Sequence, residues 1–225
     1  MPSHLTPIEN PAPVVMLTGD PRRAFALAGD LMEQPRMSHL ARGLWGYTGT
    51  TAAGMDLTVQ STGSGGPAAA AVLGDLAGLG VRTVVRMGTC VLPGGATGAA
   101  AGSAILVERA LCCDGASSAL NGREAAVWPD PGLFERLSGV APPGVVSSHD
   151  LVARFDPREP GPAEGALVRD LQTASVLTLS RKLGLAAAAV LVVSGDGAGG
   201  RLSEDEMAPG FLELGREVNR RLENS

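Results

Sequence analysis

The stretch LTVQSTGSGGPAAAAVLGDLAGLGVRTVVRMGTC, residues 57–90, carries the strongest fold signal in this chain. It predicts a strand, a glycine-rich loop, a helix that begins at Pro67, a second strand over 81–87 and a tight turn at Gly88. Glycines before a helix start offer bare backbone N–H groups to an anion. Arg86 ends the apolar second strand, and a buried guanidinium needs an anionic or carbonyl partner because an unpaired buried charge is very costly. The stretch therefore predicts a phosphate-handling site in an α/β domain.

Length and composition limit the class of protein. The 225 residues suffice for one large domain, and we expect a single domain over residues 1–225. A hydrophobic fraction of 44% predicts a well-buried globule. The net charge of −5 argues against a nucleic-acid surface, although local arginines can still bind a small anion. Three cysteines without metal-type spacing indicate a reducing compartment, and the longest apolar run is too short to span a bilayer. We therefore expect a cytoplasmic protein that binds neither nucleic acid nor membrane.

Predicted strands and helices alternate along the chain. The expected strands are residues 14–18, 40–50, 55–62, 81–87, 103–108, 145–148 and 185–193. The expected helices are residues 21–32, 67–79, 128–137, 166–183 and 204–222. Loops or turns are expected over residues 94–102, 114–118 and 154–164. This alternation predicts an α/β layered fold with a largely parallel sheet, in which ligands lie outside the carboxyl ends of the strands.

Several candidate anion ligands follow these strands. Arg23 falls in the first turn of the helix that starts at Pro21, where a cation opposes the helix dipole unless an anion is bound. Several arginines around one phosphate hold it by charge-assisted hydrogen bonds. The candidates for such an arginine-and-backbone site are Gly19, Arg23, Arg42, Arg86 and Thr89.

Other classes of site do not fit the spacing. Residues 61–65 lack the G-x-S-x-G order of a hydrolase nucleophile, and the absence of lysine before Lys182 excludes a Walker P-loop. The turn after the first strand is not the G-x-G-x-x-G of a dinucleotide fold. We expect no metal site because the three histidines are scattered away from clustered cysteines or carboxylates; they are His4, His39 and His149.

Four motifs occur in an order that resembles a known family. These motifs are TGDPRR at 18–23, GYTG at 46–49, STGSGGP at 61–67 and RMGTC at 86–90. Together they resemble the nucleoside phosphorylases, in the branch of hexameric uridine and purine nucleoside phosphorylases. The overall residue pattern is most similar to that of uridine phosphorylases. The resemblance covers nearly the whole chain and implies a three-layer α/β/α sandwich around a mixed, largely parallel sheet. It implies reversible phosphorolysis of a (deoxy)ribonucleoside to free base and (deoxy)ribose 1-phosphate, without a cofactor and with inorganic phosphate as co-substrate.

The resemblance also implies residue roles and an assembly. The implied phosphate ligands are Gly19, Arg23, Arg86 and Thr89, with Arg42 supplied by a neighbouring subunit. The implied ribose ligands are Leu171, Gln172 and a neighbour's His4. The implied base contacts are Gly88, Val152, Asp170 and Ser194. Arg86 and Asp196 are the implied catalytic residues, with Asp196 as a proton donor to a purine N7. Because Arg42 and His4 would come from a neighbouring subunit, the resemblance implies a homo-oligomer of dimer units, assembled as a hexamer.

Departures from the family pattern leave the base and the activity open. The family's Glu-Met-Glu reads Asp170-Leu171-Gln172 here, and the amide loses a charge-assisted bond worth about 1–2 kcal/mol more than a neutral one. The uracil-reading Gln-x-Arg has no counterpart in residues 154–164, and Val152 stands where an aromatic usually stacks. The family's Ser-Asp after the last strand is shifted by one residue to Asp196.

Three hypotheses therefore stand side by side. The overall residue pattern favours a uridine-like phosphorylase. A purine-directed phosphorylase would use Asp196 as its acid. A catalytically weak nucleoside- or phosphate-binding relative is the third. A hydrolytic nucleosidase is disfavoured, because water as nucleophile would not need the retained arginines.

Overall fold

The computed structural model describes residues 4–93, 99–122, 124–152, 155–156, 165–195 and 200–224. Within these ranges one mixed sheet has the strand order β2-β3-β4-β1-β5-β10-β6-β8-β9, with β7 paired to β6. The strands are β1 Val14–Thr18, β2 Met32–His39, β3 Gly46–Thr51, β4 Asp56–Ser61, β5 Thr83–Cys90, β6 Ala104–Cys112, β7 Ala126–Val127, β8 Pro143–Ser148, β9 Val168–Asp170 and β10 Ala186–Val193. The helices are α1 Pro21–Leu31, the 3₁₀ turn η1 Ala41–Gly43, α2 Gly66–Gly78, α3 Gly115–Asn121, α4 Pro131–Arg136, α5 Thr173–Leu183 and α6 Glu204–Glu223.

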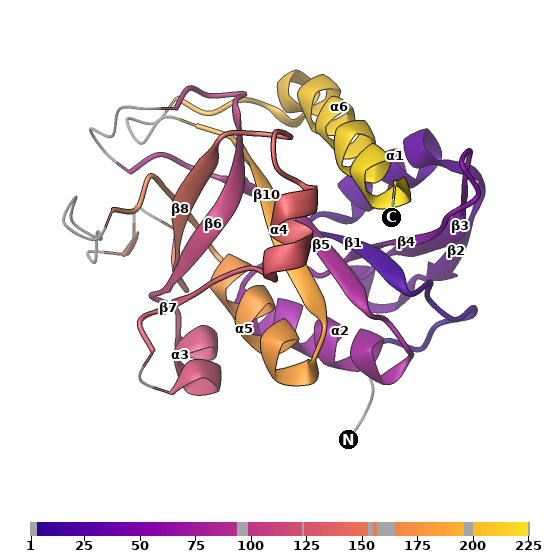
Figure 1. The fold of residues 1–225 in the computed structure, drawn as a ribbon, viewed down its shortest axis with the longest axis horizontal. Coiled ribbons are helices and arrows are strands. Elements are labelled where there is room, and N and C mark those ends of the chain that lie inside the picture. The colour runs from indigo at the N-terminus through magenta and orange to yellow at the C-terminus, as the bar shows by residue number, and fades with distance from the viewer. Residues whose placement is uncertain are drawn as a thin grey trace.

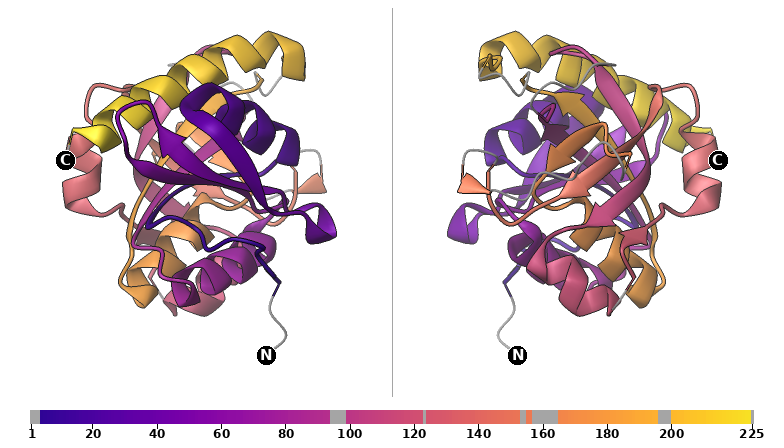
Figure 2. Two further views of the ribbon diagram at one scale, coloured as in Figure 1. Left: turned by 90° about the vertical axis from the view of Figure 1, so that its right-hand side faces the viewer. Right: turned by 90° about the vertical axis from the view of Figure 1, so that its left-hand side faces the viewer.

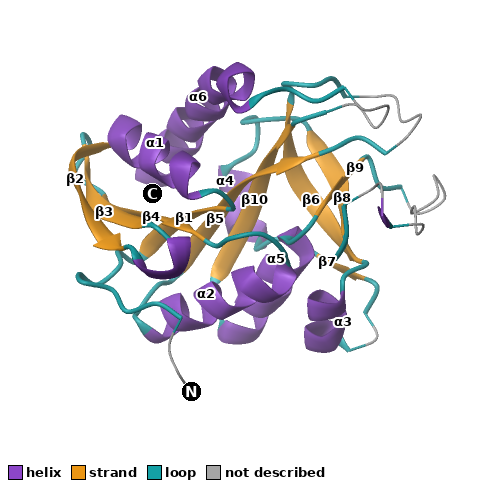
Figure 3. Cartoon of the chain, turned by 180° about the vertical axis from the view of Figure 1, so that it is seen from behind, coloured by secondary structure: helices purple, strands orange, loops and turns teal. Residues whose placement is uncertain are grey.

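Helices cover both faces of the sheet. Figure 1 shows α2, α3 and α5 on one side and α1, α4 and α6 on the other. The same layers are seen edge-on in Figure 2 and from behind in Figure 3. The expected α/β sandwich around a mixed, largely parallel sheet is thus confirmed.

The central strands are apolar because they are buried on both faces. β4, β1, β5 and β10 run parallel to one another, as expected of strands joined by covering helices. Successive residues of a strand point to opposite faces. In β1, Val15 and Leu17 pack in the cluster with α2 and α5, whereas Met16 packs in the cluster with α1 and α6.

Some expected elements were wrong. Residues 166–183 form not one helix but β9 followed by α5. The three residues of β9 are too few to show the alternating polar pattern of a strand in the sequence. The strand β2 was not predicted; it contains Pro35, charged residues and bulged pairing, features that an edge strand tolerates. Residues 114–118 begin the helix α3, capped by Asp114, and are not a simple turn. The strand expected over 40–50 starts only at Gly46, after η1.

Candidate active site

The candidate site forms at the sheet edge where parallel strands end and helices begin. β1 lies between β4 and β5, so the carboxyl ends of the three strands meet. The chain leaves β1 into α1 and leaves β4 through the glycine loop into α2, while β9 leads into α5. The N-termini of α1 and α2 therefore lie at this edge, where backbone N–H groups can bind an anion. The start of α5 lies beside the glycine loop, because Gln172 Nε2 donates to Gly63 O.

Thr62 joins the glycine loop to the end of β1 and to the start of α5. Its backbone N–H donates to Thr18 O at 2.8 Å, and its Oγ1 lies 3.0 Å from the same oxygen. Its Oγ1 also lies 3.0 Å from Gln172 Oε1. A Cβ added at Gly66 would lie 2.4 Å from Ser175 Oγ and 2.8 Å from Asp114 Oδ1, so glycine is required where α2 approaches α5 and α3.

Arg86 has the partners that its burial demands. Its side chain is 4% exposed. Its Nε donates to Thr173 Oγ1 at 2.9 Å, Nη1 to Gln172 Oε1 at 3.1 Å and Nη2 to Asp170 Oδ2 at 2.8 Å. A Cβ at Gly88 would lie 2.6 Å from Arg86 Cζ, so this glycine makes room for the guanidinium over its own strand. A guanidinium has five N–H groups, and two remain for a ligand.

Asp170 holds Arg86 and also starts α5. Its Oδ1 accepts from Ser148 Oγ at 2.6 Å, and its Oδ2 accepts from Thr173 N at 3.0 Å. Its side chain is 1% exposed. A carboxylate that caps a helix and balances a buried cation is fixed from several directions. The structure thus gives Asp170 a positioning role toward Arg86, which the base contact implied by the resemblance did not include.

Gln172 links the glycine loop to Arg86. Its Oε1 accepts from Thr62 and Arg86, and its Nε2 donates to Gly63 O at 3.1 Å. Both lone pairs of the amide oxygen are used, and one N–H remains. A Cβ at Gly19 would lie 3.6 Å from Gly63 O and 3.9 Å from Gln172 Nε2, so Gly19 also borders this site. Leu171, before it, is half-buried.

Arg23 approaches the same edge from α1. Its Nε and Nη2 donate to the two carboxylate oxygens of Glu204 at 3.0 and 2.6 Å, and its Nη1 lies 3.4 Å from Thr89 Oγ1. Its Cζ lies 5.3 Å from the ring centroid of Phe211. Arg23 thus contacts Thr89, while Gly19 and Arg86 both lie beside Gln172, so these four anion candidates fall near the carboxyl ends of β1 and β5.

Of the remaining candidates, Ser194 follows β10 beside the end of β5, whereas His4 and Arg42 lie on exposed segments. Arg42 is exposed on η1 with a φ of 59°. His4 is exposed, and its backbone N–H donates to Asp75 Oδ2 on α2 at 2.6 Å. Val152 is 43% exposed, whereas Ser194 is buried and donates from Oγ to Cys90 O at 2.9 Å. Asp196 lies outside the described residues.

A second buried polar cluster joins β8, β9 and the segment between them. His149 Nδ1 lies 2.8 Å from Asp156 Oδ2, and His149 Nε2 lies 3.1 Å from Ser147 Oγ. Arg169 Nη2 donates to Asp156 Oδ2 at 3.3 Å and to Leu151 O at 3.2 Å. The serine, histidine and aspartate types suit a nucleophilic triad, but Ser147 is 0% exposed and no substrate can reach it. The cluster holds His149 and Asp156, from the segment between β8 and β9, against the sheet.

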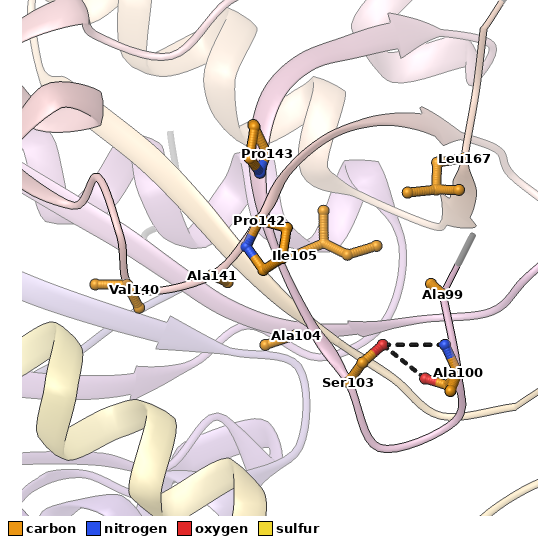
Figure 4. A pocket seen from close by; sticks show the side chains of 10 residues that line it. All are labelled: Ala99, Ala100, Ser103, Ala104, Ile105, Val140, Ala141, Pro142, Pro143 and Leu167. Carbon is orange, nitrogen blue, oxygen red and sulfur yellow. Dashed lines mark hydrogen bonds between the residues drawn. The ribbon is translucent and has the colours of Figure 1, made fainter.

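Neither the apolar cavity nor the metal-ligating side chains of the described residues form a second polar site. An apolar cavity of about 470 Å³ lies where β6 and β8 begin, and it is shown in Figure 4. Its one hydroxyl, Ser103 Oγ, is bonded to the backbone of Ala100, so the cavity offers little to orient an anion. Among the described residues no group of histidine, cysteine and carboxylate side chains could hold a metal ion. Nor does any helix in the described part of the chain have the length and apolar character needed to cross a membrane.

Sequence reasoning missed the partners of the two arginines. That Arg86 needs an anion was foreseen, but Asp170, 84 positions away, could not be chosen from spacing alone. Glu204 is 181 positions from Arg23, and its only sequence signal is an acidic residue in the first turn of a helix. Local patterns cannot identify contacts of this separation.

The structure is an α/β sandwich with Arg86 and Arg23 near the carboxyl ends of its parallel strands, and comparison with known proteins names its family. No family model matches the chain. A purine nucleoside phosphorylase DeoD-type of Geobacillus kaustophilus is 30% identical over 196 residues, covering 80% of this chain and 79% of the relative. One of Caldanaerobacter subterraneus is 29% identical over 195 residues, covering 81% and 82%. A shorter match to one of Oceanobacillus iheyensis, 38% identical over 77 residues, spans 34% of this chain and 32% of that relative.

Solved structures agree on the fold. A uridine phosphorylase from Vibrio fischeri superposes with a TM-score of 0.81 at 22% identity, covering 95% of this chain and 92% of the other. A purine nucleoside phosphorylase from Toxoplasma gondii, in complex with immucillin-H, gives a TM-score of 0.82 at 19% identity, covering 96% and 93%. The chain belongs to the nucleoside phosphorylase family, as its motifs indicated.

Proposed function

We propose that this protein is a pentosyltransferase that cleaves nucleosides with inorganic phosphate. A phosphate oxygen forms a bond to C1′ of the (deoxy)ribose while the bond from C1′ to the base nitrogen breaks. The bonding electrons leave with the base, which takes up a proton, and the products are free base and (deoxy)ribose 1-phosphate. No cofactor is needed, because phosphate itself is the second substrate.

The observation that carries the proposal is the gathering of Gly19, Arg23, Arg86 and Thr89 at one sheet edge. The N–H groups of the two arginines, the Gly19 backbone and the Thr89 hydroxyl would hold phosphate by charge-assisted bonds. Catalysis in this scheme comes from positioning phosphate beside C1′ and from stabilising the charges that develop there. Gly88 contributes by making room for the Arg86 guanidinium over its own strand.

An oligomeric site is part of the proposal. Arg42 and His4 are exposed, and the arm that carries His4 is attached to α2 at Asp75. Two apolar side chains near Arg42 are also exposed, Met37 at 36% and Leu40 at 54%. We therefore propose that a neighbouring copy covers this edge and receives Arg42 and His4, in dimers that assemble further to a hexamer in the cytoplasm.

Subunit complementation tests the shared site. Arg42→Ala and Arg86→Ala should each be inactive alone, because each removes one side of every site. Co-expressed, they should recover part of the activity, since a mixed dimer contains one site with both arginines. Two inactive variants that never complement, in a protein shown by light scattering to be oligomeric, would contradict the assignment of Arg42 to a neighbour's site.

For the base, we place purine nucleosides first and uridine second. The sequence relatives that cover most of this chain are named purine nucleoside phosphorylases, whereas the uridine phosphorylase is similar at the level of the fold. In the purine scheme Asp196 protonates N7, and Ser194 and Val152 contact the base. The uridine preference suggested by sequence texture remains the competing expectation.

One observation favours a second candidate, a weakly active nucleoside- or phosphate-binding relative. The Gln172 oxygen is already occupied by Thr62 and Arg86, so it has no lone pair for a ribose hydroxyl. Gln172→Glu separates the two candidates. A large gain in turnover with this variant would show that the amide limits catalysis, whereas unchanged or lower turnover would show that the native site is already adapted to it.

The deciding assay incubates the protein with a panel of purine and pyrimidine ribo- and deoxyribonucleosides, with and without phosphate. We expect free base and pentose 1-phosphate only when phosphate is present. Base release without phosphate would contradict the phosphorylase proposal. Arg86→Ala should abolish phosphate-dependent base release, and an unchanged apparent phosphate affinity in this variant would refute the role of Arg86.

A further inference from the structure

We propose that Glu204, at the start of α6, is an internal competitor of phosphate that occupies Arg23 until phosphate displaces it. The inference rests on the proposed function, because it concerns the affinity of that same site for its anionic substrate. It assigns to Glu204 the control of phosphate affinity, a role given to no residue above.

The Glu204 carboxylate binds Arg23 as a phosphate would. Two carboxylate oxygens receive two parallel N–H groups, Nε at 3.0 Å and Nη2 at 2.6 Å. This bidentate geometry is the one in which a guanidinium also recognises two oxygens of a phosphate. Glu204 and phosphate therefore compete for the same edge of Arg23.

Glu204 can leave at little cost. Its side chain is 45% exposed, and within the described part of the chain its hydrogen bonds go to Arg23 alone. Exposed ion pairs of this kind contribute little, because water solvates both charges once they separate. Arg22 is a second cation nearby; its pKa is raised mainly by its hydrogen bond to Asp20, and the negative charge of Glu204 adds to the rise.

Arg23 stays in position when Glu204 leaves. Its guanidinium lies over the Phe211 ring, at 5.3 Å from the centroid, and its Nη1 is 3.4 Å from Thr89 Oγ1. Neither contact involves the carboxylate. The displacement is therefore an exchange of anions on a prepared guanidinium and requires no movement of α1.

The charge balance favours this exchange. On this chain the positive charges of Arg23 and Arg86 are matched by the negative charges of Glu204 and Asp170. Asp170 is buried and fixed by Ser148 and Thr173, so it cannot leave. The departure of Glu204 leaves the two arginines and Asp170 with one net positive charge, which attracts a phosphate anion.

The experiment compares Glu204→Gln with Glu213→Gln. Glu213 is a matched control because it too is a glutamate of α6 that pairs with an arginine. Its partner is Arg216, at 3.1 Å, and its side chain is 70% exposed. Binding of inorganic phosphate is measured by calorimetry, and the phosphate KM and kcat by base release. Glu204→Gln should tighten phosphate binding and lower its KM about five-fold, the equivalent of one exposed ion pair, with kcat changed much less. Glu213→Gln should change neither quantity.

The same variants in an Arg23→Ala background localise the effect. Glu204→Gln should then give no gain, because the residue for which the two anions compete is absent. Equal or weaker phosphate binding in Glu204→Gln, no phosphate binding in either protein, or a gain that persists without Arg23 would each overturn the inference. Tighter phosphate binding without any nucleoside turnover would support the inference while contradicting the proposed function.

Discussion

Two arginines border the candidate phosphate site, and each is paired with a carboxylate of its own chain. Arg86 and Asp170 lie within 2.8 Å of each other with side chains 4% and 1% exposed, whereas the Arg23 and Glu204 side chains are 14% and 45% exposed. A buried ion that loses its partner is left unsolvated, so the first pair must persist. A solvated carboxylate is stabilised by water, so the second pair can exchange. The arginine–carboxylate pair between β5 and β9 therefore stabilises the fold, whereas the pair between α1 and α6 can exchange its carboxylate for another anion.

The largest predicted effect tests this contrast on stability. Arg86→Ala should lower the free energy of unfolding by about 3–5 kcal/mol, because Asp170 is left buried without its cation. Arg23→Ala should cost about 1 kcal/mol, and Arg36→Ala, whose pair with Glu9 is 66% exposed on the arginine side, should cost less. Urea denaturation measures all three. Equal losses for Arg86→Ala and Arg23→Ala would remove the basis of the comparison.

The next prediction concerns the packing of the buried wall. Gly66→Ala should destabilise the protein by about 1–3 kcal/mol, since its Cβ would lie 2.4 Å from Ser175 Oγ. Gly74→Ala is the matched control on the same helix, where a Cβ meets nothing within 4 Å. That variant should stabilise α2 by about 0.5–1 kcal/mol, because alanine is the better helix former. Thermal unfolding of the two variants should shift in opposite directions, and a shared direction would show that α2 does not approach α5 as described.

A smaller effect is expected from the hydroxyl that joins the glycine loop to Gln172. Thr62→Val keeps the side-chain shape and removes a buried hydroxyl whose Oγ1 lies 3.0 Å from both Thr18 O and Gln172 Oε1. The expected loss is about 1–2 kcal/mol. Thr50→Val is the control, because its hydroxyl binds Asp56 at 3.1 Å on an exposed strand position and should contribute close to nothing. Chemical denaturation that fails to separate the two variants would argue against the linking role of Thr62.

The smallest effect is a chemical one at the end of β5. Burial raises the pKa of the Cys90 thiol, the nearby Asp170 charge raises it further, and Arg86 opposes the rise. In the unfolded chain the thiol ionises near its usual pKa of about 8.5, so the contribution of Cys90 to stability is complete below that pH and is lost as pH rises above it. Iodoacetamide at pH 8 should therefore leave Cys90 unmodified in the folded protein, while the half-buried Cys112 and Cys113 are the candidates for modification. Peptide mapping that finds Cys90 alkylated without unfolding would contradict its burial.

Sequence patterns indicated candidate ligands but not the partners of the two arginines. Gly19, Arg23, Arg86 and Thr89 are candidates because each lies near the carboxyl end of a strand, and the carboxyl ends of parallel strands must meet at one edge. The second carboxylate, Glu204, carried no comparable signal. It lies on the last helix, and its position beside Arg23 depends on how α6 packs across the sheet.

The sequence by itself determined the alternation of strands and helices, the glycine loop before α2 and the need of Arg86 for an anion, because these follow from local periodicity and from the cost of burying a charge. Only the tertiary structure decided which anion that is. It selected Asp170 for Arg86 by placing β9 and α5 against β5, and Glu204 for Arg23 by laying α6 against α1. The physical reason is that pairing energy depends on distance and solvent exposure, and neither quantity is fixed until the chain has folded.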